Sequence, residues 1–152
     1  MSAATDCPLC SHDQGTEIWS DDRLRVIDAN EPGWPGFTRV VWHRHVREMT
    51  DLNAYDRQHL MQAVWAVEQV MRDHLAPAKI NLAQFGNLVP HIHWHVIPRW
   101  PEDDRFPDAF WAAPRTLGPA DASAWNRLRE RVRRAIPSYH QALKVALDGL
   151  PP

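Results

Sequence analysis

Residues 89–98 read VPHIHWHVIP, and this stretch decides the fold. It places three histidines at alternate positions: His91, His93 and His95. On a β-strand, side chains alternate between the two faces, so the three imidazoles would share one face and apolar residues the other. On a helix they would spread over about 200°. Because proline cannot donate to a sheet ladder, Pro90 and Pro98 predict a strand over 91–97 between them.

The sequence on either side predicts the other elements of an α+β fold. Runs of β-branched and aromatic residues predict strands over 17–19, 24–27, 37–42 and 79–85. An apolar stripe at helical spacing predicts one central helix, which begins at Asp51 or Asp56 and ends before Pro77. The stripe consists of Leu60, Val64, Val67, Met71 and Leu75. Strands around one helix favour an antiparallel sheet of about five strands.

The C-terminal part predicts helices that extend this fold. A helix is expected from about 121 to 136, where Pro137 breaks it, and a short final helix over 139–150. Trp65 and Trp125 fit the helical stripes and are expected in the core. Trp100 and Trp111 lie in the proline-rich stretch after the histidines, where either simple packing or a base pocket or dimer interface would suit them.

Composition restricts the class of protein. The 152 residues are 44% hydrophobic and 24% charged, which is typical of a single globular domain over 1–152. The net charge of -2 gives no reason to expect a nucleic-acid partner. No apolar run approaches the roughly 20 residues that span a bilayer, so no membrane partner is expected. The N-terminus lacks the features of a signal peptide, and we expect a cytoplasmic protein.

Three imidazoles on one strand are compatible with several chemistries. Neutral imidazole is a common metal ligand, so His91, His93 and His95 would suit a metal-dependent hydrolase or oxygenase. Alternatively, one histidine attacks an electrophile while its neighbours orient it or donate hydrogen bonds. A polar sheet face with satisfied histidines is the third possibility. The spacing alone does not decide between them.

Residues 91–97 resemble the motif of the histidine triad (HIT) family, His-φ-His-φ-His-φ-φ, in which φ is apolar. Residues 86–90 resemble the Gly-Gln-Ser/Thr-Val segment that often precedes the motif. Residues 35–46 are similar to the family's Pro-Gly-His strand, which ends in a basic turn and a histidine. The resemblance covers about residues 7–100, with a helical extension over about 119–150. It implies a HIT-like fold and a homodimer in which the two sheets join.

The resemblance also implies a reaction. HIT proteins are nucleotide hydrolases or nucleotidyltransferases that act on the α-phosphate of a nucleoside phosphate conjugate, such as a dinucleoside polyphosphate or a nucleoside phosphoramidate. Carried over by position, His93 is the nucleophile that forms a nucleotidyl-histidine intermediate. His95 hydrogen-bonds the phosphate or the leaving atom, and His91 supports them. Asn87 and Asn81 contact phosphate. An unperturbed histidine is mostly neutral at pH 7, so this step requires no cofactor.

Three positions depart from the family's pattern. Leu88 stands where many relatives have Ser or Thr, and Phe37 replaces the histidine of Pro-Gly-His. Ala29 falls where relatives place a ribose-binding Asp or Asn, and Asp28 or Asn30 would have to substitute for it. These departures leave open a nucleotide-binding or interaction module without catalysis.

The N-terminal sequence CPLC over 7–10 is a Cys-x-x-Cys pair. Some HIT relatives bind structural zinc with such a pair and two histidines, and the resemblance implies a set formed by Cys7, Cys10, His45 and His91. The alternative is a reduced thiol pair packed near the sheet. A redox role is not favoured, because the pair opens no helix that would lower a thiol pKa.

Overall fold

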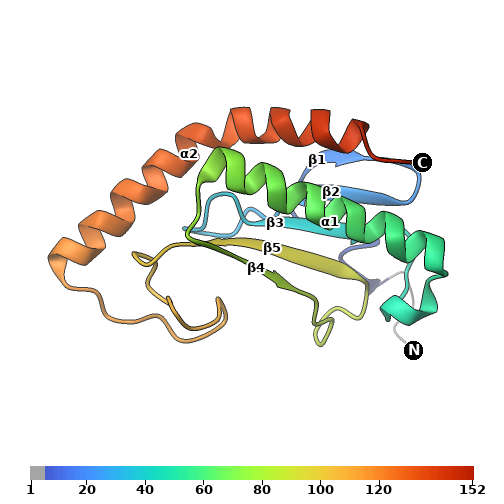
Figure 1. Cartoon of the computed structure of the whole chain (residues 1–152). Coiled ribbons are helices and arrows are strands. Elements are labelled where there is room, and N and C mark those ends of the chain that lie inside the picture. The colour runs from blue at the N-terminus through green and yellow to red at the C-terminus, as the bar shows by residue number, and fades with distance from the viewer. Residues whose placement is uncertain (1–5) are drawn as a thin grey trace.

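The computed structural model describes residues 6–152 and contains one five-stranded antiparallel sheet in the order β1-β2-β3-β5-β4. Its elements are β1 (Thr16–Ser20), β2 (Leu24–Asp28), β3 (Thr38–Trp42), α1 (Ala54–Leu75), β4 (Lys79–Ala83), β5 (His93–Arg99) and α2 (Pro119–Asp148). Both helices lie on the same face of the sheet (Figure 1). The predicted α+β fold with about five antiparallel strands is confirmed.

The central helix α1 follows the apolar stripe that predicts it. All five stripe residues are buried. The cap differs from the prediction: the side chain of Asn53 accepts a hydrogen bond from the backbone N–H of Asp56. Asp51 instead ends a short 3-10 turn, Met49–Asp51. The expectation that Trp65 lies in the core is wrong, since its side chain is 49% exposed. It follows Val64 by one residue, which turns it about 100° away from the stripe.

The C-terminal helix α2 is continuous, so the prediction that Pro137 ends it is wrong. A proline removes one helical hydrogen bond and bends a helix, and Figure 1 shows α2 changing direction along its length. Buried residues before and after Pro137 hold both halves of the helix against the rest of the molecule. They are Trp125, Val132, Tyr139, Leu143 and Leu147. The gain from burying these side chains outweighs the lost hydrogen bond.

Strand β5 is shifted by two residues from its predicted span, since it begins at His93 and includes Pro98. Pairing with β3 ends at Val96, so Pro98 lies beyond the end of that neighbour. The carbonyl of Pro98 accepts a hydrogen bond from the indole of Trp34. The missing N–H therefore costs no ladder bond with β3.

The two faces of the sheet differ in what covers them. The helices bury an apolar core on one face. On the other face, residues 7–14 pack against β2 and β3 near one end, and the stretch 100–118 follows β5 near the other. Between residues 6 and 152, no helix is long and apolar enough to cross a membrane.

Candidate active site and metal-binding cluster

A cavity of about 530 Å³ opens on the sheet face that the helices leave uncovered. The sheet contributes Arg39, His93 and His95 to its wall. The loop between β4 and β5 contributes residues 85–89. The remaining lining residues come from the N-terminal segment and the stretch after β5: Leu9, Gln14, Ala109 and Trp111. Four separate parts of the chain thus meet around two histidines of the triad.

The ring of His93 is oriented by a backbone carbonyl just before β5. Its Nδ1 lies 2.6 Å from the carbonyl oxygen of His91. A carbonyl only accepts, so the hydrogen-bond network assigns the proton to Nδ1 and a free lone pair to Nε2. Burial lowers the pKa of His93; the bond to the His91 carbonyl opposes this shift and the charge of Arg39 adds to it. At neutral pH, His93 is therefore an uncharged imidazole whose Nε2 carries a lone pair.

His95 carries its proton on the opposite nitrogen. Nε of Arg39 donates to Nδ1 of His95 at 3.3 Å, so Nε2 must hold the hydrogen. Burial lowers the pKa of His95 to about 3, and the charges of His93 and Arg39 act in the same direction. The rings of His93 and His95 are 4.8 Å apart between centroids. A lone pair and an N–H donor thus lie side by side at the cavity.

The structure brings one of the three predicted substrate-binding residues to this cavity. Asn87 is in its wall. Asn81 is not, because its Oδ1 accepts a hydrogen bond from Arg99 at 2.8 Å. Asp28 alternates onto the helix-covered face, where its carboxylate lies 3.3 Å from the ring of His140 on α2. A one-residue step along a strand reverses the face, which explains why Asp28 is displaced from the site.

Two wall residues, Arg39 and Gln14, were missed by the sequence reasoning. Only the register between β3 and β5 could have identified Arg39, because Arg39 is directly opposite His95 in that strand pair. That pairing joins residues 56 positions apart, and no local pattern predicts it. Gln14 enters the wall only because the N-terminal segment folds back over the sheet.

The positions that depart from the family's pattern have distinct surroundings. Phe37 is buried and its ring meets the ring of His95 edge to face, with centroids 5.7 Å apart. Leu88 is 97% exposed at the cavity and offers no hydrogen-bond donor from its side chain. Ala29 packs against the core between the sheet and the helices.

The four predicted metal ligands converge beside the cavity. The two sulfurs and the two Nδ1 atoms of Cys7, Cys10, His45 and His91 all lie within 4.8 Å of one another. The Nδ1 atom of His91 is 3.5 Å from Cys7 and 3.4 Å from Cys10, and that of His45 is 3.4 Å from Cys10. Tetrahedral zinc, with S at about 2.3 Å and N at about 2.0 Å, separates S from N by about 3.5 Å. The set therefore fits zinc.

A hydrogen bond on the other ring nitrogen of His91 leaves its Nδ1 free to bind a metal. Its Nε2 donates to the carbonyl oxygen of Trp42 at 2.5 Å, which leaves Nδ1 unprotonated and directed at the cysteines. Within residues 6–152, the only group of three or more candidate ligands contains His91 but neither His93 nor His95. The triad therefore does not form the three-histidine ligand set that the spacing alone allowed.

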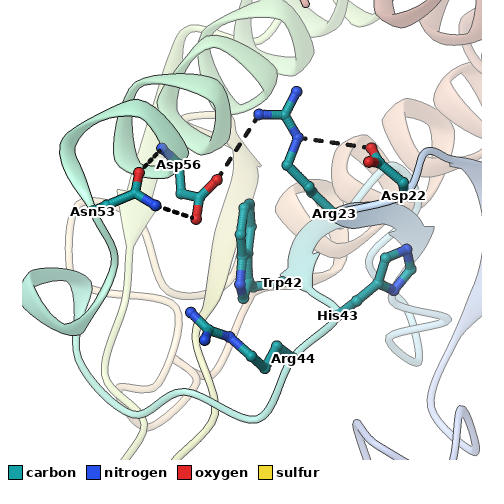
Figure 2. A pocket seen from close by; sticks show the side chains of 7 residues that line it. All are labelled: Asp22, Arg23, Trp42, His43, Arg44, Asn53 and Asp56. Carbon is teal, nitrogen blue, oxygen red and sulfur yellow. Dashed lines mark hydrogen bonds and ion pairs between the residues drawn. The ribbon is translucent and has the colours of Figure 1, made fainter.

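A second cavity, of about 310 Å³, lies at the end of β3 near the start of α1. Figure 2 shows Arg23 between Asp22 and Asp56, at 3.7 and 3.9 Å. The cavity contains no triad histidine, and with Arg44 its lining holds two arginines against these two carboxylates. The larger cavity is the one that contains His93 and His95.

The comparisons with known proteins agree with this geometry. A family model described as "HIT domain" matches residues 13–102. The chain is 31% identical over 108 residues to a Mycobacterium tuberculosis protein named AP-4-A phosphorylase. The match covers 67% of this chain and 55% of the relative. A Schizosaccharomyces pombe protein named bis(5'-nucleosyl)-tetraphosphatase (asymmetrical) is 29% identical over 91 residues, 56% and 50% of the two chains. The chain thus spans about half the length of these curated relatives.

Solved structures share the fold at lower identity. A histidine triad protein of Bradyrhizobium japonicum superposes with a TM-score of 0.62 at 24% identity and covers 83% of this chain and 93% of that one. One of Sinorhizobium meliloti gives a TM-score of 0.63 at 22% identity, over 88% and 99%. Because the family model spans more than half of the sequence and carries the triad itself, this chain belongs to the HIT, or histidine triad, family.

Proposed function

We propose that this protein is a nucleotide hydrolase or nucleotidyltransferase that cleaves at the α-phosphate of a dinucleoside polyphosphate or a nucleoside phosphoramidate. The observation that carries the proposal is the hydrogen bond from Nδ1 of His93 to the carbonyl of His91, which leaves Nε2 free as a nucleophile beside His95. The names of two curated relatives, a phosphorylase and a tetraphosphatase of dinucleoside polyphosphates, support the substrate class.

In the first step, the lone pair on Nε2 of His93 forms a bond to the α-phosphorus, and the bond to the leaving group breaks. The leaving group departs with the electron pair, and the N–H of His95 stabilises the charge that develops on the bridging oxygen. A polyphosphate leaves as an anion and needs no proton. The amine of a phosphoramidate leaves neutral by taking the proton from Nε2 of His95, and the water of the second step then returns a proton to His95. The nucleotidyl-imidazolium is stabilised by its remaining hydrogen bond to the His91 carbonyl.

In the second step, water or another acceptor attacks the same phosphorus and the electron pair of the N–P bond returns to His93. With water, the products are a nucleoside monophosphate and a proton released to solvent. Phosphoryl-type transfer depends mainly on positioning and charge stabilisation, which the cavity wall supplies. Asn87 in that wall is positioned to contact a phosphate oxygen.

Rapid-quench intact-protein mass spectrometry with diadenosine tetraphosphate tests the nucleophile. We expect a transient adenylate adduct on the wild type and none on His93→Ala, which should fold normally and lose turnover. Added imidazole should partly restore turnover to His93→Gly. His74→Ala, at the exposed end of α1, is the matched control. Retained turnover in His93→Ala would refute the mechanism, and nucleotide binding without turnover in the wild type would favour a non-catalytic binding module.

We also propose that Cys7, Cys10, His45 and His91 bind a structural zinc ion, because their donor atoms fit its tetrahedral geometry. When bound, the metal would tie the N-terminal segment to the segment that follows β3 and to the residues just before β5. Elemental analysis should find one zinc per chain in the wild type and much less in Cys10→Ser, with a lower melting temperature. Equal zinc content in the two proteins would contradict the assignment.

The resemblance to the family further leads us to propose a homodimer in which the two sheets join. Strand β4 supports this, because it lies at an edge of the sheet and pairs only with β5 among residues 6–152. Light scattering after size-exclusion chromatography should give twice the 17.5 kDa chain mass. A monomer at micromolar concentration would contradict the proposal.

A further inference from the structure

Arg39 gives the larger cavity its charge. Among the described residues that line it, Arg39 is the only one with a permanent charge, and none carries a carboxylate. No ion pair within residues 6–152 includes Arg39. Glu31 influences it only from beyond ion-pair distance. The cavity therefore presents the positive charge of Arg39 to a ligand with no carboxylate in its wall to compensate it.

The guanidinium is held in place and still has free donors. Its Nε donates to Nδ1 of His95 at 3.3 Å and its Nη1 to Oε1 of Gln14 at 3.4 Å. It lies over the ring of Phe37, 5.5 Å from the centroid. A guanidinium has five N–H donors in a planar fork, so the remaining ones can bind an anion in the cavity.

Arg39 also provides what Phe37 cannot. Phe37 occupies the position of the histidine in the family's Pro-Gly-His segment, and its side chain has no donor. It supports the His95 ring by an edge-to-face contact alone. The hydrogen bond that selects the tautomer of His95 comes from Arg39, which is two residues further along the chain and whose guanidinium lies over the Phe37 ring.

We propose that Arg39 binds the phosphate chain of the leaving group while its Nε holds His95 with the N–H on Nε2, so that the site prefers substrates whose α-phosphate is linked to further phosphates. This inference rests on the proposed function and narrows its substrate class. A polyphosphate brings several negative charges to the guanidinium, and the planar fork binds phosphate oxygens in a bidentate manner. A phosphoramidate, whose leaving group is an amine, gains nothing from these donors.

The first test compares the binding of ATP and AMP by calorimetry, in a His93→Ala background that prevents turnover. Arg39→Met should weaken ATP binding about 10- to 100-fold, the size of one or two charge-assisted hydrogen bonds, and AMP binding less than about 3-fold. Arg44→Met is the matched control, because Arg44 lines the other cavity (Figure 2). Equal losses for the two nucleotides, or no loss, would overturn the inference.

The second test reads the tautomer of His95 by ¹⁵N NMR without any substrate. The wild type should show a protonated Nε2 and an unprotonated Nδ1, and Arg39→Met should show a mixture of tautomers. Arg39→Lys keeps the charge but not the fork, so it should retain part of the ATP preference and lose the single tautomer. An unchanged tautomer in Arg39→Met would overturn the positioning role. Arg39→Gln replaces Arg39→Met if melting curves show that the latter does not fold.

These measurements separate the two proposals. Binding and NMR need no turnover, so they remain informative even if no nucleotidyl-histidine forms and the proposed function fails. If the adduct forms, kcat/KM gives a third readout. Arg39→Met should then reduce kcat/KM for diadenosine tetraphosphate at least about 10-fold more than for adenosine phosphoramidate. Equal reductions would leave the proposed function intact and refute the preference for polyphosphate.

Discussion

The two faces of the sheet bury their side chains in opposite ways. Towards the helices, the strands present apolar residues that are fully buried: Leu24, Val26, Val40 and Val96. On the other face, the same strands bury the polar side chains of Arg25, His93, His95 and Arg99 and half-bury that of Arg39, each with at least one hydrogen-bond partner. One alternating pattern therefore separates packing from chemistry, because successive residues of a strand point to opposite faces.

The two faces differ in how specific the contacts of their buried side chains must be. Apolar burial is non-directional and tolerates many shapes of about the right volume. A buried polar group is stable only while its specific partner is present, and removal of one partner leaves the other unsatisfied. We therefore expect substitutions on the polar face to change stability and activity together, and substitutions on the apolar face to change stability alone.

The largest effect is expected at the buried ion pair beneath the stretch after β5. Arg99 donates to both carboxylate oxygens of Asp103, at 2.9 and 3.1 Å, and Asp103 is 0% exposed. Asp103→Ala should lower the free energy of unfolding by about 3–5 kcal/mol, because it leaves a buried guanidinium unpaired. It should also weaken nucleotide binding, since this stretch carries Trp111 in the cavity wall. Denaturant unfolding and calorimetry measure the two effects.

A double variant is the control for that interpretation. If the unpaired charge is the cause, Arg99→Met with Asp103→Leu should be less destabilised than Asp103→Ala alone. A double variant that is the less stable of the two would show that the pair itself contributes the stability.

The next effect concerns the apolar face. Leu60 on α1 is fully buried in the core, and Leu60→Ala should lower the free energy of unfolding by about 2–5 kcal/mol. Nucleotide affinity per folded molecule should stay unchanged, because nothing on the polar face loses a partner. Unfolding curves and calorimetry on the same sample check both statements. A loss of nucleotide affinity in Leu60→Ala as large as that in Asp103→Ala would contradict the expectation that the apolar face affects stability alone.

A smaller effect, dependent on pH, is expected where the sheet meets α1. Burial alone would raise the pKa of Asp21, but hydrogen bonds from the backbone of Leu24 and Arg23 and from His59 outweigh it and lower that pKa from 3.8. A lowered folded pKa stabilises the protein above the unfolded pKa, and the contribution is lost as the pH falls through the folded value. Asp21→Asn should therefore cost about 1 kcal/mol at pH 7.

The pH dependence gives the check on this prediction. Urea unfolding at pH 7, 5 and 3 should show the full difference between the wild type and Asp21→Asn at the first two values and a smaller difference at the lowest. A difference that persists unchanged at pH 3 would mean that the carboxylate charge of Asp21 is not its source.

The smallest effect is expected on the outer surface of α1. Trp65 is half exposed, so Trp65→Gln should change the free energy of unfolding by less than about 0.5 kcal/mol. Light scattering on the same variant adds a second reading. A shift from dimer to monomer would place Trp65 in a subunit interface, and a large loss of stability in an unchanged oligomer would contradict its exposed position.

The sequence alone predicted the parts of this molecule that depend on local periodicity. The alternation of His93 and His95 with Trp94 and Val96 predicts a strand, and the stripe on α1 predicts a buried helix face. The four candidate metal ligands also followed from the sequence, through the resemblance to the HIT family. The errors at Pro98 and Pro137 have one cause: the tertiary structure tolerates the missing N–H of each proline. Pairing with β3 ends before Pro98, and buried residues hold α2 on both sides of Pro137.

The amino-acid sequence by itself determined the fold class, the triad and the family, because strand and helix periods are properties of consecutive residues. Only the tertiary structure decided which side chains surround His93 and His95. Asn81 and Asp28 do not line that cavity: Asn81 bonds Arg99, and strand alternation places Asp28 on the other face, beside His140. Arg39 was included because β3 and β5 pair in one register. That register results from packing between segments distant in the chain, and a one-residue shift would turn Arg39 away from the site.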